Sequence, residues 1–267
     1  LANDSLVLNK HFDATISSQK VGSKLLKRNI SDFAAMGATP SHAVVACLLP
    51  PNTSIEWIRG FYNGLEETAS DYSILIVGGD ISSTFEDLAF TLTLLGTGAK
   101  RPITRRSAQA GDTLWVTGSL GGSIKKKHLE FEPRINEGVW LSKSSAVSSA
   151  MDVSDGLATD LLNLCPANCR VELDTDSLPI SEDAYHLAEK SDQSPICHAL
   201  TDGEDYELLF TVGASTNPIE FLKDWAGAFE TALTCIGKVI TRHSEEDATI
   251  QYRGSYSDSK DHGYEHF

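Results

Sequence analysis

Segments with a helical period alternate with segments with a strand period along most of this chain, and this alternation limits the folds open to it. Apolar residues recur at helical spacing from Gln19 to Met36, and β-type residues follow from Ala43 to Leu49. The strand stops at Pro50-Pro51, because proline cannot donate to a strand ladder. Alternation of this kind predicts an α/β fold, or an α+β fold, with mixed sheets.

The same alternation continues through the rest of the chain. Thr53 and Glu56 have the spacing of a capping box and predict a helix that begins there. A short buried strand is expected at 73–77, ending in Gly78-Gly79-Asp80, and a half-buried strand at 88–94. Later segments predict strands at 113–117, 170–174, 207–212 and 234–240, and helices at 154–164, after Ser181 and after the cap Asn217.

A polar and basic stretch from Lys100 to Asp112 separates two halves of this pattern. A chain of 267 residues is long for one domain and sufficient for two. We therefore expect an N-terminal domain at 1–104 and a C-terminal α/β domain at 105–267, with a polar, loop-rich tail from Arg242 to Asp261. The chain opens at Leu1, and Leu6-Val7-Leu8 resembles the middle of a structural element, so we also expect sequence upstream of it.

The formal net charge of −15 argues against nucleic acid and anionic membranes as partners, because both require a basic face. It is compatible with a phosphorylated substrate if divalent cations lie between carboxylates and phosphate oxygens. No apolar run approaches the roughly 20 residues of a membrane span. Five cysteines, an odd number in a chain too large to need disulfides, favour a reducing compartment, and we expect the cytoplasm.

Common nucleotide and hydrolase signatures are missing from the sequence. The glycine-rich stretch 118–123 has no lysine where a P-loop requires one, and neither Gly-x-Ser-x-Gly nor His-Glu-x-x-His occurs. What recurs is an aspartate near the end of an apolar element, beside small residues. The instances are Asp4, Asp32, Asp80, Asp152 and Asp155.

Each of these aspartates alone is typical of a turn or a helix cap. We expect Asp32, Asp80, Asp152 and Asp155 to converge on one cleft between the two domains. Acids gathered in this way would repel ATP and a phosphate ester by roughly 4 kcal/mol per pair of charges 4 Å apart at an effective dielectric near 20. Several Mg²⁺ ions that bridge the acids to phosphate would make the arrangement favourable. Ser154 and Asp155 also precede a helix, where backbone N–H groups favour anions.

Four motifs, in this order, resemble those of thiamine-monophosphate kinase: residues 29–40, Gly78-Gly79-Asp80, residues 152–157 and residues 203–208. The likeness spans Asp4 to Val212, with a final match at 263–267. Aminoimidazole ribonucleotide synthetase and selenophosphate synthetase belong to the same wider superfamily but are less similar at 31–40 and 203–208. Selenophosphate synthesis would also call for a cysteine near the start, and none precedes Cys47.

The resemblance implies the two-domain fold of the aminoimidazole ribonucleotide synthetase superfamily and a homodimer formed through the N-terminal sheet. It also implies that ATP phosphorylates thiamine monophosphate to thiamine diphosphate by in-line transfer, assisted by Mg²⁺. The acceptor phosphate is already anionic near neutral pH, so no catalytic base is assigned.

The resemblance further implies a role for individual residues. It assigns Asp4, Asp32, Asp80, Asp152 and Asp155 to Mg²⁺, with the Asn3 carbonyl oxygen beside them; Gly79, Asp80, Arg105 and Ser154 to ATP; and His11, Glu204 and Tyr264 to thiamine monophosphate. Without the resemblance, the ordinary alternatives stay open: a solvated loop arginine, a surface carboxylate, a histidine at a strand end and a packed C-terminal aromatic ring.

The chain departs from the family pattern in three places. A Gly-Asp-Asp segment that usually lies upstream is absent, Ala2-Asn3 stands where the family tends to have a Ser/Thr pair, and Asp202 replaces the first glycine of Gly-Gly-Glu-Asp-Tyr. Two alternatives stay open: another ATP-using synthetase of the superfamily, and a non-catalytic nucleotide-binding homologue, for which Ala2-Asn3 is an argument.

Overall fold

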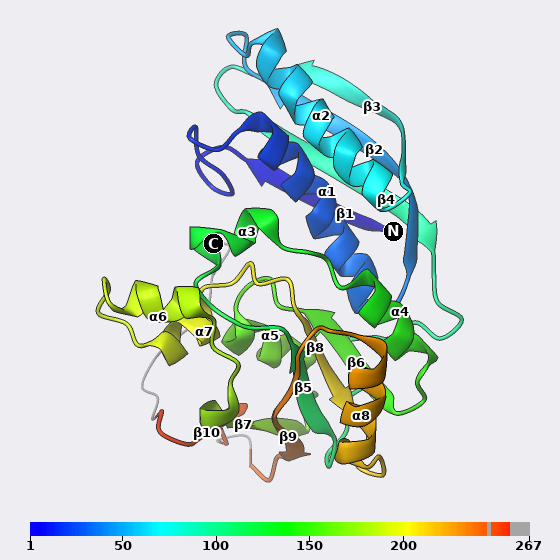
Figure 1. Ribbon diagram of the computed structural model, residues 1–267, viewed down its shortest axis with the longest axis vertical. Helices are drawn as coiled ribbons and strands as arrows, with labels where there is room; N and C mark the ends of the chain where they lie inside the picture. The colour runs from blue at the N-terminus through cyan, green and yellow to red at the C-terminus, as the bar shows by residue number, and fades with distance from the viewer. Residues whose placement is uncertain (245–246, 257–267) are drawn as a thin grey trace.

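Two mixed sheets organise the chain in the computed structural model, which describes residues 1–244 and 247–256 (Figure 1). The first sheet has the order β1-β4-β2-β3, with β2 and β3 parallel and the other neighbours antiparallel. Its strands are β1 (Ala2–Val7), β2 (Thr39–Leu49), β3 (Leu75–Ser83) and β4 (Ala89–Thr97).

Helices α1 (Ser18–Ala35) and α2 (Ile55–Asp71) cover one face of this sheet (Figure 1). Both helices arise where the apolar period predicted them. The cap of α2 differs from the expectation: the Ser54 side chain accepts from the Trp57 N–H, whereas the Thr53 hydroxyl donates to the Pro50 carbonyl at 2.8 Å. The chain turns away from the proline pair through Thr53, so the helix begins one residue later than the capping-box pattern placed it.

Strand β3 is exposed, so the prediction of a buried strand is wrong. Leu75, Val77 and Ile81 are 62%, 58% and 61% exposed, because β3 is an edge strand. Of the apolar residues of β3, only Ile76 packs against the core under the helices. Gly78-Gly79-Asp80 lies inside the strand and does not follow it. A Cβ on Gly79 would stand 2.0 Å from the Val45 carbonyl oxygen, so only glycine permits this approach of β3 to β2.

The second sheet has the order β10-β7-β9-β5-β8-β6. Helices α5 and α7 pack on one face, and Phe221 and Trp225 of α8 pack on the other. Strand β10 lies within the tail that was expected to be loop-rich, where it pairs in parallel with β7. The elements are β5 (Thr113–Thr117), α3 (Lys127–Glu130), α4 (Ile135–Lys143), β6 (Val147–Asp152), α5 (Leu157–Leu164), β7 (Cys169–Asp174), α6 (Glu182–Ala188), α7 (Pro195–Thr201), β8 (Leu208–Val212), α8 (Pro218–Ala228), β9 (Leu233–Thr241) and β10 (Ile250–Arg253).

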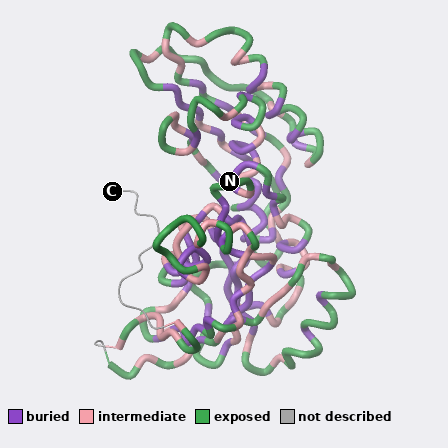
Figure 2. The backbone as a smooth tube through the Cα atoms, turned by 60° about the vertical axis from the view of Figure 1, so that its left-hand side comes forward, coloured by how far each residue is buried: buried purple, intermediate pink, exposed green. Residues whose placement is uncertain are grey.

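Helix α1 lies where the two halves meet, and Figure 2 shows buried backbone running across this junction. One face of α1 packs on the first sheet, and its C-terminal end joins the core of the second through Ala34 and Ala35. Its buried positions include the polar residues Lys24, Asn29 and Ser31, each of which needs a partner. The expected boundary after residue 104 falls between β4 and β5 and stays a prediction. Among the described helices, none has the length and apolar character needed to cross a bilayer.

Candidate functional site

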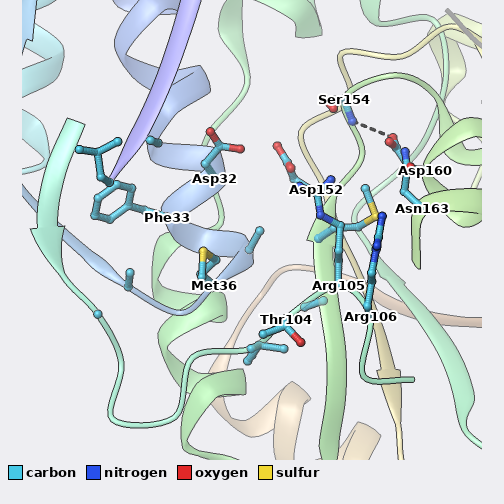
Figure 3. Close-up of a pocket in the computed structure, with 18 of the residues that line it drawn as sticks. Asp32, Phe33, Met36, Thr104, Arg105, Arg106, Asp152, Ser154, Asp160 and Asn163 are labelled. Atoms are coloured by element: carbon cyan, nitrogen blue, oxygen red, sulfur yellow. Dashed lines mark hydrogen bonds between the residues drawn. The ribbon is translucent and has the colours of Figure 1, made fainter. Parts of the chain in front are cut away.

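A cleft of about 830 Å³ lies at the junction of the two halves. Its walls come from the start of β1, the C-terminal end of α1, the segment between β4 and β5, and the end of β6 with the turn that follows (Figure 3). The polar residues among its walls are Asn3, Asp32, Thr104, Arg105, Arg106, Asp152, Ser154, Asp155, Asp160 and Asn163.

The two halves each contribute a carboxylate that projects into this cleft. Asp32 comes from the last turn of α1 and Asp152 ends β6, and the two face each other across the opening (Figure 3). The Ser31 hydroxyl donates to Asp152 Oδ2 at 2.5 Å, so α1 and β6 are linked directly beside the acids. The structure therefore brings together Asp32 and Asp152, which are 120 positions apart in the sequence, as the sequence predicted.

The carboxyl groups in this region have raised pKa values, because their surroundings disfavour the charged form. Burial, then the charges of Asp152 and Asp4, raise the pKa of Asp32 to about 8, although its side chain remains open to the cleft. Burial and the nearby Asp4 also raise the pKa of Asp152, against the effect of the Ser31 hydrogen bond. Burial raises the pKa of Asp4 as well, with a further contribution from Asp155. A site with these shifts favours bound cations.

The turn that carries Ser154 and Asp155 is closed by a residue that sequence reasoning missed. Asp160, in the first turn of α5, is 1% exposed, and its Oδ2 accepts the N–H groups of Ser154 at 3.0 Å and Asp155 at 3.1 Å. These N–H groups were expected to be free for an anion, and the Asp160 carboxylate occupies them. Burial, then Asp152 and Asp155, raise the pKa of Asp160 to about 8. Its Oδ1 is buried and has no hydrogen-bond partner.

Asn3 and Arg105 also line the cleft. The Asn3 amide nitrogen donates to the Leu92 carbonyl and the Thr93 hydroxyl, so its carbonyl oxygen is the atom left for a ligand. Arg105 is exposed in the segment between the sheets, and its charge acts on Asp32. Arg105 is therefore at the cleft with the acids, as its expected contact with phosphate requires.

His11 and Glu204 lie close to each other, beside the acids but not among the walls of the cleft. The two residues share Lys24, whose ammonium group donates to the His11 carbonyl and to the Glu204 carboxylate. Burial and the nearby Arg28 lower the pKa of His11, and its Nδ1 accepts the Val7 N–H at 3.0 Å. Tyr264, the third residue expected to contact the acceptor, lies outside the described residues.

Gly79 and Asp80 do not join the other site residues within one chain, so the expected convergence is wrong for Asp80. They lie on β3, which β2 and β4 separate from β1, a distance of about 14 Å at the usual strand spacing. Asp80 pairs with the exposed Ala46, whereas the neighbouring Val45 faces the helices. Asp80 therefore lies on the face of the sheet opposite α1, where the Ser82 hydroxyl donates to its carboxylate at 3.0 Å.

The donors in the cleft are oxygens, the ligands that Mg²⁺ prefers. Among the residues that the structure describes, no group of three or more His, Cys, Asp or Glu is arranged to hold a metal ion by itself. Mg²⁺ is commonly held by one or two carboxylates together with water and substrate phosphates, so a complete protein cage is not required. The facing pair Asp32 and Asp152, with its raised pKa values, fits an ion of this kind.

Comparison with known proteins gives consistent matches. Residues 1–99 match the family described as AIR synthase related protein, N-terminal domain. The chain is 41% identical over 227 residues to the thiamine-monophosphate kinase of Rhodopirellula baltica. The aligned region covers 85% of this chain and 70% of that protein. The crystal structure of thiamine-monophosphate kinase from Stenotrophomonas maltophilia has a TM-score of 0.81 at 30% identity, over 95% of this chain and 84% of that chain. A structure of AaThiL complexed with AMPPCP and TMP has a TM-score of 0.79 at 28% identity, over 97% and 85%.

Proposed function

The chain belongs to the thiamine-monophosphate kinase family, and we propose that it transfers the γ-phosphate of ATP to thiamine monophosphate to give thiamine diphosphate. It is an ATP-dependent phosphotransferase whose acceptor is itself a phosphate group. The observation that carries this proposal is the cleft in which Asp32 of α1 faces Asp152 of β6, with Arg105 beside them. A relative of the same fold is complexed with an ATP analogue and TMP.

The acids of the cleft are the residues that would hold magnesium. Asp32, Asp152 and Asp155 line it, Asp4 lies within electrostatic range of Asp32, and the Asn3 carbonyl oxygen completes the set. Bound Mg²⁺ would neutralise phosphate charge and align the reacting groups. Arg105 presents a guanidinium that can bind phosphate through two parallel hydrogen bonds. Because its N–H is occupied by Asp160, Ser154 would bind ATP through its hydroxyl.

The acceptor residues lie beside this cleft. His11 and Glu204 support a binding site for thiamine monophosphate next to the acids, and Tyr264 is proposed as the third contact. The terminal phosphate oxygen of the acceptor attacks the γ-phosphorus in line. That oxygen is already anionic near neutral pH, so the residues need to position it and do not need to deprotonate it.

The role of Asp80 and Gly79 in this reaction requires a second copy of the chain. The uncovered face of the first sheet carries a row of Leu95, His42 and Leu75, in which both leucines are exposed. We expect a homodimer to form through this face, which would bring β3 of one chain to the neighbouring chain. The proposed contacts of Asp80 with ATP and Mg²⁺ would then be made in the partner's cleft. The five free cysteines are compatible with a reducing compartment, and we propose the cytoplasm.

A phosphotransfer assay tests the proposal directly. The purified chain is incubated with ATP, MgCl₂ and thiamine monophosphate, and ADP and thiamine diphosphate are separated by chromatography. We expect equal amounts of the two products, and none with unphosphorylated thiamine as acceptor. ADP without thiamine diphosphate would favour another ATP-using synthetase. ATP binding by calorimetry without any turnover would favour a non-catalytic homologue.

A further inference from the structure

A lysine is completely buried in the middle of α1. The side chain of Lys24 has 0% of its surface exposed, and burial lowers its pKa. A buried ammonium ion is costly unless its donors are paired. The Lys24 Nζ has three partners at hydrogen-bonding distance: Glu204 Oε1 at 2.8 Å, Glu204 Oε2 at 3.1 Å and the His11 carbonyl oxygen at 2.9 Å. This number matches the three donors of a protonated lysine.

The segment that supplies Glu204 is held in a strained conformation. Glu204 and Tyr206 have φ values of +53° and +51°, a left-handed region that residues other than glycine rarely adopt. The surrounding contacts fix this backbone: the Glu204 N–H donates to the Ser154 carbonyl and the Tyr206 N–H to the Val153 carbonyl, both at 2.8 Å. The Tyr206 ring also stacks on Phe131, with ring centroids 3.9 Å apart.

This strain turns the Glu204 carboxylate toward α1 while its backbone stays beside the proposed metal ligands. The Tyr206 hydroxyl donates to Glu204 Oε1 at 3.1 Å. The Glu204 carboxylate is therefore oriented by two donors, the Lys24 ammonium group and the Tyr206 hydroxyl. The Glu204 side chain keeps 29% of its surface exposed and can contact a ligand, whereas Lys24 cannot. One turn further along α1, Arg28 pairs with Asp4 at 3.5 Å. Lys24 therefore pairs with a carboxylate proposed to contact the acceptor, and Arg28 pairs with one proposed to hold magnesium.

We propose that Lys24 is a positioning residue that assembles the acceptor end of the site. It orients the Glu204 carboxylate and fixes the His11 loop, although these residues come from opposite halves of the chain and Lys24 does not touch the acceptor. This inference rests on the proposed function, in which Glu204 and His11 contact thiamine monophosphate. Within the described part of the chain, neither His11 nor Glu204, the hydrogen-bond partners of Lys24, lines the cleft proposed for ATP.

The test is a double-mutant cycle of Lys24→Met and Glu204→Gln, with Lys20→Met as the matched control. Lys20 lies one turn earlier on α1 and pairs with Glu130 at the surface, where their side chains are 50% and 40% exposed. We expect K24M to raise the KM for thiamine monophosphate about 10-fold or more, the usual effect of losing a hydrogen bond to a charged group. The KM for ATP should stay within a few-fold of wild type, and K20M should change neither constant.

The decisive result is the double variant, because the part of the Lys24 effect that acts through Glu204 is lost once Glu204 is replaced. K24M/E204Q should therefore raise the KM for thiamine monophosphate over that of E204Q by much less than K24M raises it over wild type, and the remaining increase measures the His11 contact. Additive losses, or equal losses for both substrates in K24M, would overturn the inference. If K24M alone fails to fold, E204Q and the double variant still give the comparison, since the double variant leaves no unpaired buried charge.

The proposed function is tested separately by the wild-type chain in the same assay. Wild-type turnover with an unaltered KM in K24M rejects the role of Lys24 and leaves the activity standing. If the wild type shows no transfer, calorimetric titration with thiamine monophosphate replaces the KM values. Absence of wild-type binding in that titration rejects both.

Discussion

At the scale of single residues, burial, and then the nearness of other carboxylates, opposes the ionisation of the acids around the cleft. Asp32 and Asp160 both have pKa values raised to about 8, and Asp152 is shifted in the same direction. Only Asp160 among these three was not anticipated from the sequence. It lies inside an apolar helix with no neighbouring glycine or serine, and its partners become adjacent only after the turn at Gly156 has formed, where φ is +99°.

Asp160 gives a prediction about how the turn at 154–155 is held. Asp160→Ala removes the acceptor for two backbone N–H groups and should raise the KM for ATP about 10-fold or more, because Ser154 and Asp155 lose their fixed orientation. Asp160→Asn keeps a carbonyl oxygen that can accept both, so it should retain most of the ATP affinity. Steady-state kinetics with varied ATP measures the difference.

The comparison between these two variants separates orientation from charge. An equal loss in both would mean that the charge of Asp160, and not its place as an acceptor, matters to the nucleotide. Asp224→Asn, in the exposed part of α8, is a control for replacement of a carboxylate elsewhere and should leave the KM for ATP unchanged.

At the scale of elements, periodicity found most strands and helices because their burial follows their sequence pattern. β2 and β9, for example, occur where β-type residues predicted them, and α8 begins after Asn217 as expected. β3 shows where this reasoning stops. A short run of apolar residues is compatible with a buried strand and with an edge strand, and only the neighbours in the sheet decide between them. Asp80, which the family resemblance assigned to Mg²⁺ and ATP, lies on this edge strand and does not line the cleft of its own chain.

The exposed face of the first sheet gives a prediction about assembly. Leu75 and Leu95 pair on either side of His42 and leave an apolar row uncovered by helices. Leu75→Glu should shift the chain from dimer to monomer in sedimentation experiments, because two copies packed through this face would bury the new charges without partners. Ile219→Glu places the same charge on α8 and should leave the dimer intact, since Ile219 is 79% exposed on the second half. A monomeric wild-type chain would reject this interface.

At the scale of the whole molecule, α1 joins the two halves through contacts that are polar at the site and apolar behind it. Ser31 links to Asp152, and Lys24 links to Glu204, while Ala34 and Ala35 pack in the core of the second sheet. The sequence could not predict these links, because each joins residues more than 100 positions apart and neither partner has a distinctive motif for the other. The motifs did predict which segments would carry the acids.

The position of Asp80 makes the dimer itself part of the proposed active site, and a mixed dimer tests this. Asp80→Asn and Asp152→Asn should each abolish transfer as homodimers, because each removes a carboxylate proposed to hold magnesium. The two variants are co-expressed with different affinity tags, and dimers that carry both tags are purified. If Asp80 acts in the partner's cleft, one cleft of the mixed dimer combines an intact Asp152 with an intact Asp80 from the other chain, while the second cleft lacks both. The mixed dimer should therefore recover about half of the wild-type activity, as one working site in a twofold dimer requires. If Asp80 acts within its own chain, each cleft lacks one of the two acids, and the mixed dimer stays as inactive as its parents.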